Sequence, residues 1–169
     1  MDIHHSEQEK LKLEHEEAKF FMRAYERQTG SSIRHLWHNR PDKPDTSCLL
    51  EGERLDLEIA HLYGSEVEAM TFLGRDTNDE TIKSLQSLAA TSTSQERLLE
   101  ALNRILENKS KKIYKSKRVW LVIRNMHPEW NAQLIEAAKE SIVVPLSHGF
   151  DRIWIVGDIH GKSGVVRLD

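Results

Sequence analysis

Residues 45–63, DTSCLLEGERLDLEIAHLY, hold the clearest local structural signal in the chain. Two strand-like runs, residues 45–50 and 53–63, flank Glu51 and Gly52, a pair suited to a two-residue hairpin turn. Side chains along the second run alternate between two faces of the strand: Leu55, Leu57 and Ile59 share one, and Asp56, Glu58 and Ala60 the other. The sequence therefore predicts an antiparallel hairpin.

This hairpin brings two carboxylates together. If Leu50 pairs with Glu53 across the turn, the same register places Asp45 opposite Glu58, with Cβ atoms about 4.5–5.5 Å apart. Two facing carboxylates repel and raise each other's pKa unless a cation lies between them. Oxygen ligands at this spacing suit Mg²⁺ or Mn²⁺. The alternatives are a different register, or two acids that both point into water.

Helices and strands alternate on both sides of the hairpin. Before it we expect a helix over residues 6–28, a short strand within residues 31–38, and an extended passage through RPDKPD at residues 40–45. After it we expect a loop over residues 64–75, a helix around residues 77–89, and a second helix that starts with Thr93 and Glu96 in capping-box spacing.

The C-terminal third is predicted to be mainly strand. RVWLVIRN (residues 118–125), RIWIVGD (152–158) and GVVRL (164–168) read as strands, and Pro128 is expected to open a helix of about a dozen residues. GDIHGKSG at residues 157–164 falls one residue short of a phosphate-binding G-x-x-x-x-G-K-[ST] loop, and strand-like residues follow it rather than a helix. We therefore predict a hairpin turn around Asp158 and Gly161.

Composition indicates one globular α/β domain over residues 1–169, with a mixed sheet flanked by helices and a frayed start at residues 1–8. No apolar run approaches the ~18 residues of a membrane span, so no membrane partner is expected. The single cysteine, Cys48, excludes a disulfide framework, and we expect a reduced, cytoplasmic compartment. The net charge of −3 gives no global basic signature.

Three further charged features stand out against this background. Glu14 lies in the middle of the apolar stripe of the first helix, although glutamate is rarely buried without a partner. Leu98, Leu102 and Ile105 form a stripe that Lys109 and Lys112 continue, so Lys109 is expected to face the core; the alternative is a frayed helix end with a snorkelling side chain. Residues 109–118, KSKKIYKSKR, carry six cations and no acid, typical of a solvated face or of a phosphate-binding segment.

In the order of these motifs the chain resembles the PD-(D/E)XK nuclease superfamily, which has the restriction-endonuclease-like fold. The matching pieces are Glu14 in EHEEAKFFMRAY, the Pro44-Asp45 pair in RPDKPD, and Glu58 in LDLEIAH. ILENKSKKIYKSKRVWLVI resembles the helix-to-strand passage of several uncharacterised bacterial members. The resemblance covers residues 10 to 158, most of the chain.

The resemblance implies that Asp45 and Glu58 bind a divalent metal, Mg²⁺ or Mn²⁺, with Glu14 as a third acidic member. In the superfamily a lysine two residues after the glutamate helps to activate water, but that position here is Ala60. His61 points to the opposite face of the strand. Some members move the lysine to a neighbouring helix, and Lys109 is the first candidate for that role, with Lys112 second.

These expectations favour a metal-dependent nuclease, with nucleic acid, DNA in the first instance, as its partner. The basic segment would contact the nucleic-acid backbone through Lys109, Lys111, Lys112, Lys115, Lys117 and Arg118. The main alternative is a catalytically inactive nucleic-acid-binding or regulatory domain on the same fold, and a third is a module that binds an acidic protein. Nucleases that cut both strands often act as dimers, so a homodimer stays open.

Overall fold

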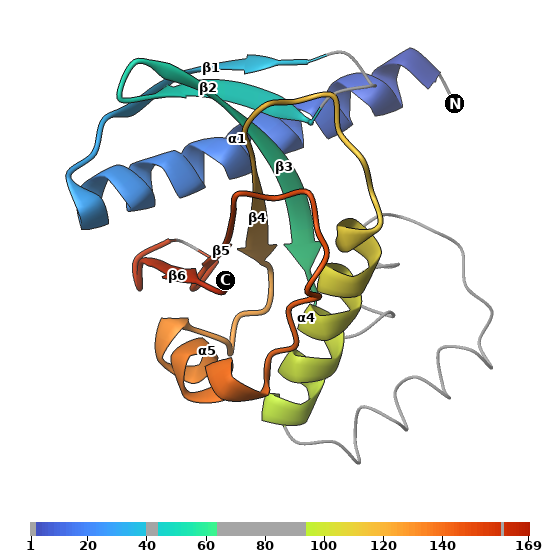
Figure 1. Ribbon diagram of the computed structural model, residues 1–169, viewed down its shortest axis with the longest axis vertical. Helices are drawn as coiled ribbons and strands as arrows, with labels where there is room; N and C mark the ends of the chain where they lie inside the picture. Colours follow the sequence, from blue (N-terminus) through green and yellow to red (C-terminus); the bar gives the residue numbers. More distant parts are fainter. Residues whose placement is uncertain (1–2, 40–43, 64–93, 160) are drawn as a thin grey trace.

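The computed structural model describes residues 3–39, 44–63, 94–159 and 161–169 of the chain (Figure 1). The elements in these residues are α1 (Ile3–Thr29), β1 (Ile33–His38), β2 (Thr46–Leu50), β3 (Glu53–Leu62), α4 (Ser94–Ser110), β4 (Val119–Asn125), α5 (Ala132–Ala138), the 3₁₀-helix η1 (Lys139–Ser141), β5 (Arg152–Val156) and β6 (Val165–Arg167).

The strands form one mixed sheet in the order β1-β2-β3-β4-β5-β6. Strands β1, β2 and β3 are antiparallel, β4 and β5 continue parallel to β3, and β6 returns antiparallel to β5. The predicted α/β fold, with a mixed sheet flanked by helices, is therefore confirmed. None of the described helices is long and apolar enough to cross a membrane.

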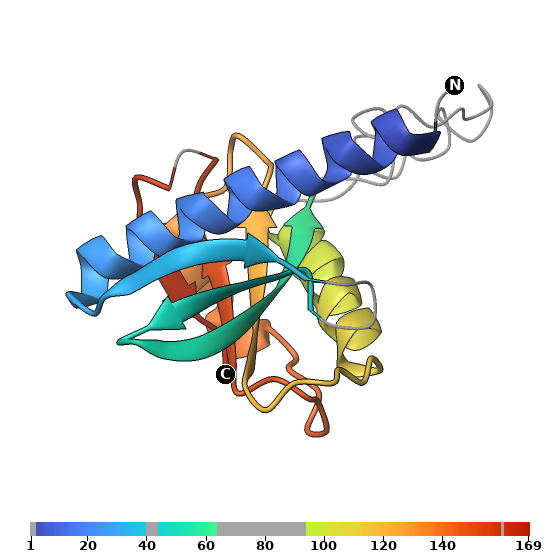
Figure 2. The same cartoon turned by 90° about the horizontal axis from the view of Figure 1, so that it is seen from above.

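Helices cover both faces of the sheet (Figure 2). On one face, α1 contributes Phe21 to a core that also holds Leu55 and Leu57. On the other, α4 packs Leu98 and Leu102 in a second core that includes α5. Strand β3 contributes to both cores, because successive side chains point to opposite faces. Its buried residues therefore come from both sides of the strand, as the alternation in the sequence indicated.

The predicted hairpin forms with the predicted register. Leu50 pairs with Glu53, and the ladder continues to Thr46 opposite Leu57. Glu51 and Gly52 have φ values of 50° and 82°, the two left-handed residues of a type I′ turn. The twist of that turn matches the twist of the flanking strands. The local chemistry of the turn therefore sets the pairing that brings Asp45 toward Glu58.

Several element boundaries differ from the prediction. Helix α1 begins at Ile3, so residues 3–8, which we expected to be frayed, belong to it. Helix α4 ends at Ser110, so the placement of Lys112 on its apolar stripe is wrong. Within α4 the third buried position is Leu106, and Ile105 is only partly buried.

The helix expected from Pro128 is also wrong in its start and length. Pro128 lies in a turn, and α5 begins at Ala132. Asn131 caps it, because its side chain accepts a hydrogen bond from the backbone N–H of Leu134 at 3.0 Å, which satisfies a donor at the helix start.

The predicted turn between the last two strands is confirmed. The Asp158 carboxylate accepts hydrogen bonds from the backbone N–H groups of Lys162 and Ser163, and Gly161 has the left-handed φ of 69° that the turn requires. The loop expected at residues 64–75, the helix around residues 77–89, the cap residue Thr93 and most of RPDKPD (residues 40–43) lie outside the described residues.

Candidate functional site

Asp45 and Glu58 meet where β2 begins. Asp45 comes one residue before the pair formed by Thr46 and Leu57, so the register of the hairpin places it beside Glu58 on β3. The Asp45 Oδ2 accepts a hydrogen bond from the backbone N–H of Ile59 at 2.9 Å. This bond holds one carboxylate oxygen of Asp45 against the strand that carries Glu58.

Lys109 reaches this pair from the last turn of α4. Its Nζ lies 3.1 Å from the Glu58 Oε1, and the two side chains are 19% and 6% exposed. Leu98, Leu102 and Leu106 bury the inner face of α4 and so direct its last turn toward β3. The prediction that Lys109 faces the core is confirmed. The lysine forms a mostly buried ion pair with the glutamate.

The pKa of Asp45 reflects its burial next to two other carboxylates. Burial raises the pKa of Asp45 to about 7, and the carboxylates of Glu58 and Glu14 act in the same direction, while the Ile59 hydrogen bond opposes them. Asp45 therefore keeps its proton close to neutral pH in the absence of a cation. A cation between the carboxylates would favour the charged form instead.

Glu14 belongs to the same acidic cluster. It is buried on α1, and burial raises its pKa; Lys10, whose Nζ lies 3.7 Å from the Glu14 Oε1, lowers it, and Glu58 raises it again. Within the described residues, however, no group of three or more His, Cys, Asp or Glu side chains has the arrangement of a metal site. The role of Glu14 as a metal ligand therefore stays a prediction.

The two carboxylates of Asp45 and Glu58 fit Mg²⁺ or Mn²⁺ by the chemistry of their donors. Mg²⁺ in proteins is commonly held by one or two carboxylates, with water and substrate phosphates as its other ligands. Both residues supply hard oxygen atoms, and the pKa of Asp45 is raised first by burial and then by the neighbouring Glu58 carboxylate. A pair is therefore enough for a divalent cation that also binds a phosphate.

Lys112 lies close to the site, although it follows α4 rather than lying on it. Partial burial lowers its pKa, and the neighbouring Lys109 adds to this effect; Glu58 and Asp45 act in the opposite direction. The side chain is largely exposed. Lys112 thus remains near enough to assist, but Lys109 makes the direct contact with Glu58.

Tyr114 is a member of the site that sequence reasoning missed. Its hydroxyl is buried and has no hydrogen-bond partner of standard geometry among the residues that the structure describes, and its ring packs on Phe150 at a centroid distance of 5.7 Å. Burial raises the pKa of Tyr114, and the proximity of Glu58 raises it further. Its only signal in the sequence is that it is the one aromatic residue within the basic segment.

The position two residues after Glu58 is occupied by a core residue. Ala60 is buried against the side of the sheet that α4 covers. Burial lowers the pKa of the neighbouring His61 to about 4, and Arg124 and Lys109 contribute to the lowering. His61 is therefore neutral at physiological pH. Neither residue supplies a positive charge next to Glu58, which leaves Lys109 in that place.

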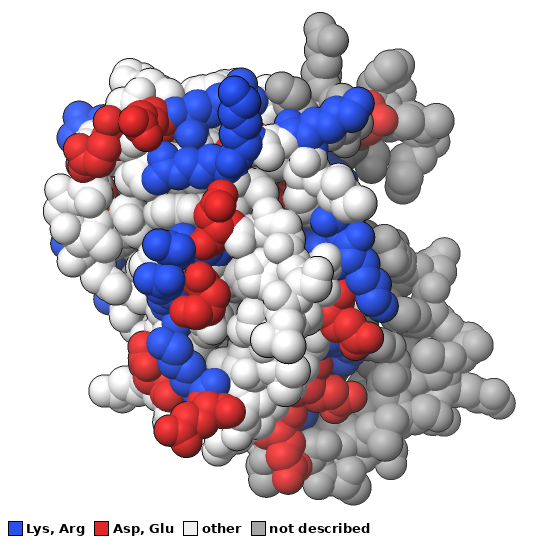
Figure 3. Space-filling view, in the orientation of Figure 1, with Lys and Arg blue, Asp and Glu red and all other residues white. Residues whose placement is uncertain are grey.

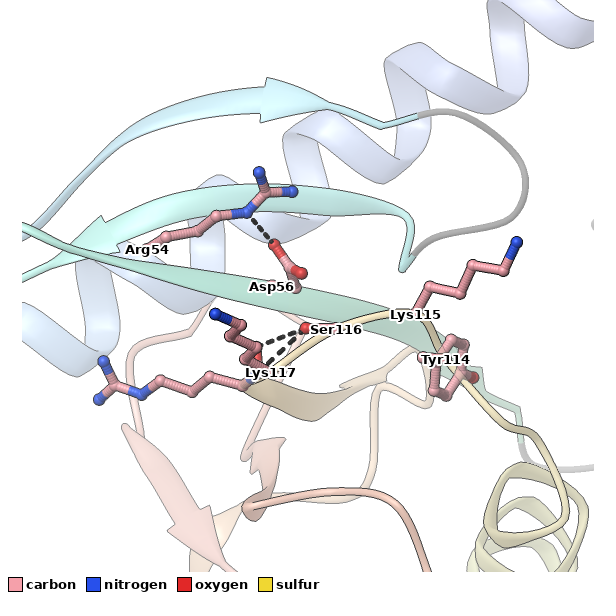
Figure 4. A pocket seen from close by; sticks show the side chains of 7 residues that line it. Arg54, Asp56, Tyr114, Lys115, Ser116 and Lys117 are labelled. Atoms are coloured by element: carbon pink, nitrogen blue, oxygen red, sulfur yellow. Dashed lines mark hydrogen bonds and ion pairs between the residues drawn. The ribbon is translucent and has the colours of Figure 1, made fainter.

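An open hollow of about 680 Å³ lies beside the site (Figure 4). Its lining residues are Arg54, Asp56, Tyr114, Lys115, Ser116, Lys117 and Arg118. Tyr114 lines this hollow and also lies close to Glu58, so it joins the hollow to the carboxylates. Lys111 takes no part in the lining; it forms an ion pair with Glu107 at 3.6 Å. The fold therefore places Lys115, Lys117 and Arg118 of the basic segment at the hollow and Lys111 away from it.

The chain matches no family model, no curated protein and no solved structure.

Proposed function

We propose that the chain is a metal-dependent nuclease on a restriction-endonuclease-like fold, which hydrolyses phosphodiester bonds of nucleic acid. One observation carries the proposal: Asp45, Glu58 and Lys109, from three separate segments, converge beside a hollow lined by cations. Two carboxylates with a partly buried lysine suit a reaction in which negative charge builds up on a phosphate. The expected mixed sheet with flanking helices agrees with this assignment.

Asp45 and Glu58 would hold Mg²⁺ or Mn²⁺, an ion that lowers the pKa of a bound water and neutralises phosphate charge. Lys109 holds the Glu58 carboxylate in place through its 3.1 Å contact and brings a positive charge beside the reacting phosphate. The Ile59 N–H orients Asp45. Hydrogen-bonded groups of this kind keep ligand oxygens in position.

A second candidate, a catalytically inactive nucleic-acid-binding or regulatory domain, is favoured by Ala60. In the superfamily pattern the lysine stands at that position, and here the side chain is a methyl group packed in the core. If Lys109 serves only to neutralise Glu58, the carboxylates lack a second positive charge. The basic hollow would still bind nucleic acid, so the two candidates differ in cleavage and not in binding.

The test compares wild type with Glu58→Gln and Lys109→Met on single-stranded and double-stranded DNA, with Mg²⁺ or Mn²⁺. Glu107→Gln is the matched control, because Glu107 lies on α4 but is exposed. We expect wild type and control to cleave equally and both site variants to lose about 100-fold or more, as when one charge-stabilising group is removed from an active site. Binding of Mn²⁺, followed by calorimetry, should weaken in Glu58→Gln.

Equal cleavage by wild type and Glu58→Gln would show that the nuclease activity lies elsewhere or comes from a contaminant. Binding of DNA without cleavage by any variant would support the inactive domain. If cleavage is lost in Glu58→Gln but kept in Lys109→Met, the nuclease proposal stands and Lys112 takes the cationic role proposed for Lys109.

A further inference from the structure

Cations from three distant parts of the chain line two neighbouring hollows. A second hollow, of about 400 Å³, shares Lys117 and Arg118 with the hollow beside Tyr114 and extends it to β5. The cationic groove, as we call the two hollows together, is lined by Arg54 from β3, by Lys115, Lys117 and Arg118 before β4, and by Arg152 from β5. Figure 3 shows Lys and Arg gathered over the segment between α4 and β4 and the neighbouring hairpin.

The two acids in the lining are already bound by the protein. The Asp56 Oδ1 accepts hydrogen bonds from Ser47 Oγ at 2.5 Å and Arg54 Nε at 2.9 Å. The Asp151 Oδ2 accepts one from the backbone N–H of Val119 at 3.0 Å. Arg54 is thus paired with Asp56, and the Arg118 Nη1 lies 3.8 Å from the Oε2 of Glu53, which is outside the lining. The five lining cations still outnumber these three acids. The groove keeps an excess of positive charge, although the whole chain carries −3.

The backbone under these cations is held in a defined shape. Ser116 Oγ donates to the carbonyl of Arg118 and accepts from its N–H, at 3.0 and 3.2 Å. The same carbonyl accepts a hydrogen bond from the Asp56 N–H at 3.0 Å, which fixes the segment to β3. A pre-ordered segment loses less conformational entropy when it binds a ligand. Its cations are therefore presented on a fixed path.

We infer that the cationic groove binds the sugar-phosphate backbone of a nucleic acid and leads it past Tyr114 to Glu58. The chemistry that recognises the ligand is a row of phosphates met by arginine and lysine, which fixes position without reading bases. Arg54 and Arg152 enter the binding surface although neither belongs to the basic segment, whereas Lys111 is excluded from it. The inference deepens the nuclease proposal, on which its substrate class rests.

The salt dependence of binding measures the number of phosphates that the groove neutralises. Labelled single-stranded and double-stranded DNA are titrated with Glu58→Gln protein in EDTA at several KCl concentrations, so that no cleavage occurs. Each phosphate contact adds about 0.9 to the slope of log K against log [salt] for duplex and about 0.7 for a single strand. We expect Lys117→Gln and Arg152→Gln, made in this background, each to reduce the magnitude of this slope by about the value of one phosphate contact.

Lys111→Gln is the matched control, because it removes a charge from the same basic segment but outside the groove. We expect it to leave the slope unchanged. The form of DNA that loses more affinity in the groove variants is the form that the groove holds. Thermal unfolding of each variant shows whether the fold is retained; a variant that unfolds is replaced by Lys117→Glu, which reverses a charge on an exposed residue.

Slopes that do not change in Lys117→Gln and Arg152→Gln, or that fall equally in Lys111→Gln, would overturn the inference. So would equal competition by polyglutamate, since the groove would then be a general site for acidic polymers. Cleavage by the protein that retains Glu58, measured in parallel, separates the two proposals. Cleavage without groove-dependent binding rejects only the groove, and groove-dependent binding without cleavage rejects only the nuclease.

Discussion

Asp45→Asn should remove a pH-dependent cost from the folded state. Folding raises the pKa of Asp45 from its ordinary value of 3.8 to about 7, first through burial and then through Glu58. Between these two pH values the folded protein holds a proton that the unfolded chain has released. The free energy of unfolding therefore falls as pH rises through this window.

The size of the effect follows from the same two values. The interval from 3.8 to about 7 corresponds to about 4 kcal/mol, at about 1.4 kcal/mol per pH unit. This figure is an upper limit, because the unfolded chain retains some structure and the pair relaxes. The asparagine keeps an oxygen that can accept the Ile59 N–H, so the variant loses the charge and little else.

The assay is urea denaturation of wild type and variant from pH 4 to pH 8 in EDTA. We expect equal stability near pH 4 and a more stable variant at pH 8. Adding Mg²⁺ should stabilise wild type more at pH 8 than at pH 5 and should have little effect on Asp45→Asn, because the ion binds the charged carboxylate.

Asp56→Asn is the matched control on the same hairpin. Burial acts to raise the pKa of Asp56, but hydrogen bonds from Ser116, Ser47 and Arg54 hold it below its ordinary value. It contributes stability above its ordinary pKa that is lost as pH falls, so its variant should be less stable than wild type at pH 7. If wild type and Asp45→Asn gave parallel curves from pH 4 to pH 8, the raised pKa of Asp45, and with it the burial of this carboxylate beside Glu58 that supports the metal site, would be refuted.

Three substitutions elsewhere extend the tests. Tyr114→Phe should change the free energy of unfolding by no more than about 1 kcal/mol, since the hydroxyl has no standard hydrogen bond within the described part of the chain. It should slow cleavage, because the hydroxyl lies close to Glu58; unchanged cleavage would remove Tyr114 from the site. Arg124→Met should lower the free energy of unfolding in urea by about 3–5 kcal/mol, because it leaves the Glu17 carboxylate buried without its ion-pair partner. The double variant with Glu17→Gln should regain part of that free energy; no gain would contradict the pairing. Gly157→Ala should cost about 1–3 kcal/mol by the same measurement, because the new Cβ would meet the Ala132 Cβ at 2.7 Å and the Ala132 Cα at 3.0 Å, as well as the Ser163 Oγ at 2.5 Å. A variant as stable as wild type would show that the backbone around Ala132 relaxes.

The central hairpin was predictable because its signals are local. Turn residues and alternating side chains act within a few positions, and together they determine the register of β2 and β3. The neighbourhood of Asp45 and Glu58 follows from that register alone. The strand around Trp120 was also predicted, since a short apolar run rich in β-branched and aromatic residues is typical of a buried strand.

Element ends were less predictable, because they depend on competing local partners. Helix α5 begins after its N-cap Asn131, although Pro128 is also favourable as the first residue of a helix. Helix α4 stopped at Ser110, so the apolar stripe did not reach Lys112. In both cases the helix-like sequence pattern is longer than the helix: it starts before α5 begins and runs on after α4 ends.

The sequence by itself determined the hairpin, its carboxylate pair and the helix that carries Lys109. Only the tertiary structure decided that Lys109 meets Glu58, 51 residues away, and that Arg54 and Arg152 line one groove with Arg118. Both results depend on the parallel pairing of β3, β4 and β5. Parallel strands are joined through long connections, so no nearby turn sets their register, and packing of the two cores has to choose it.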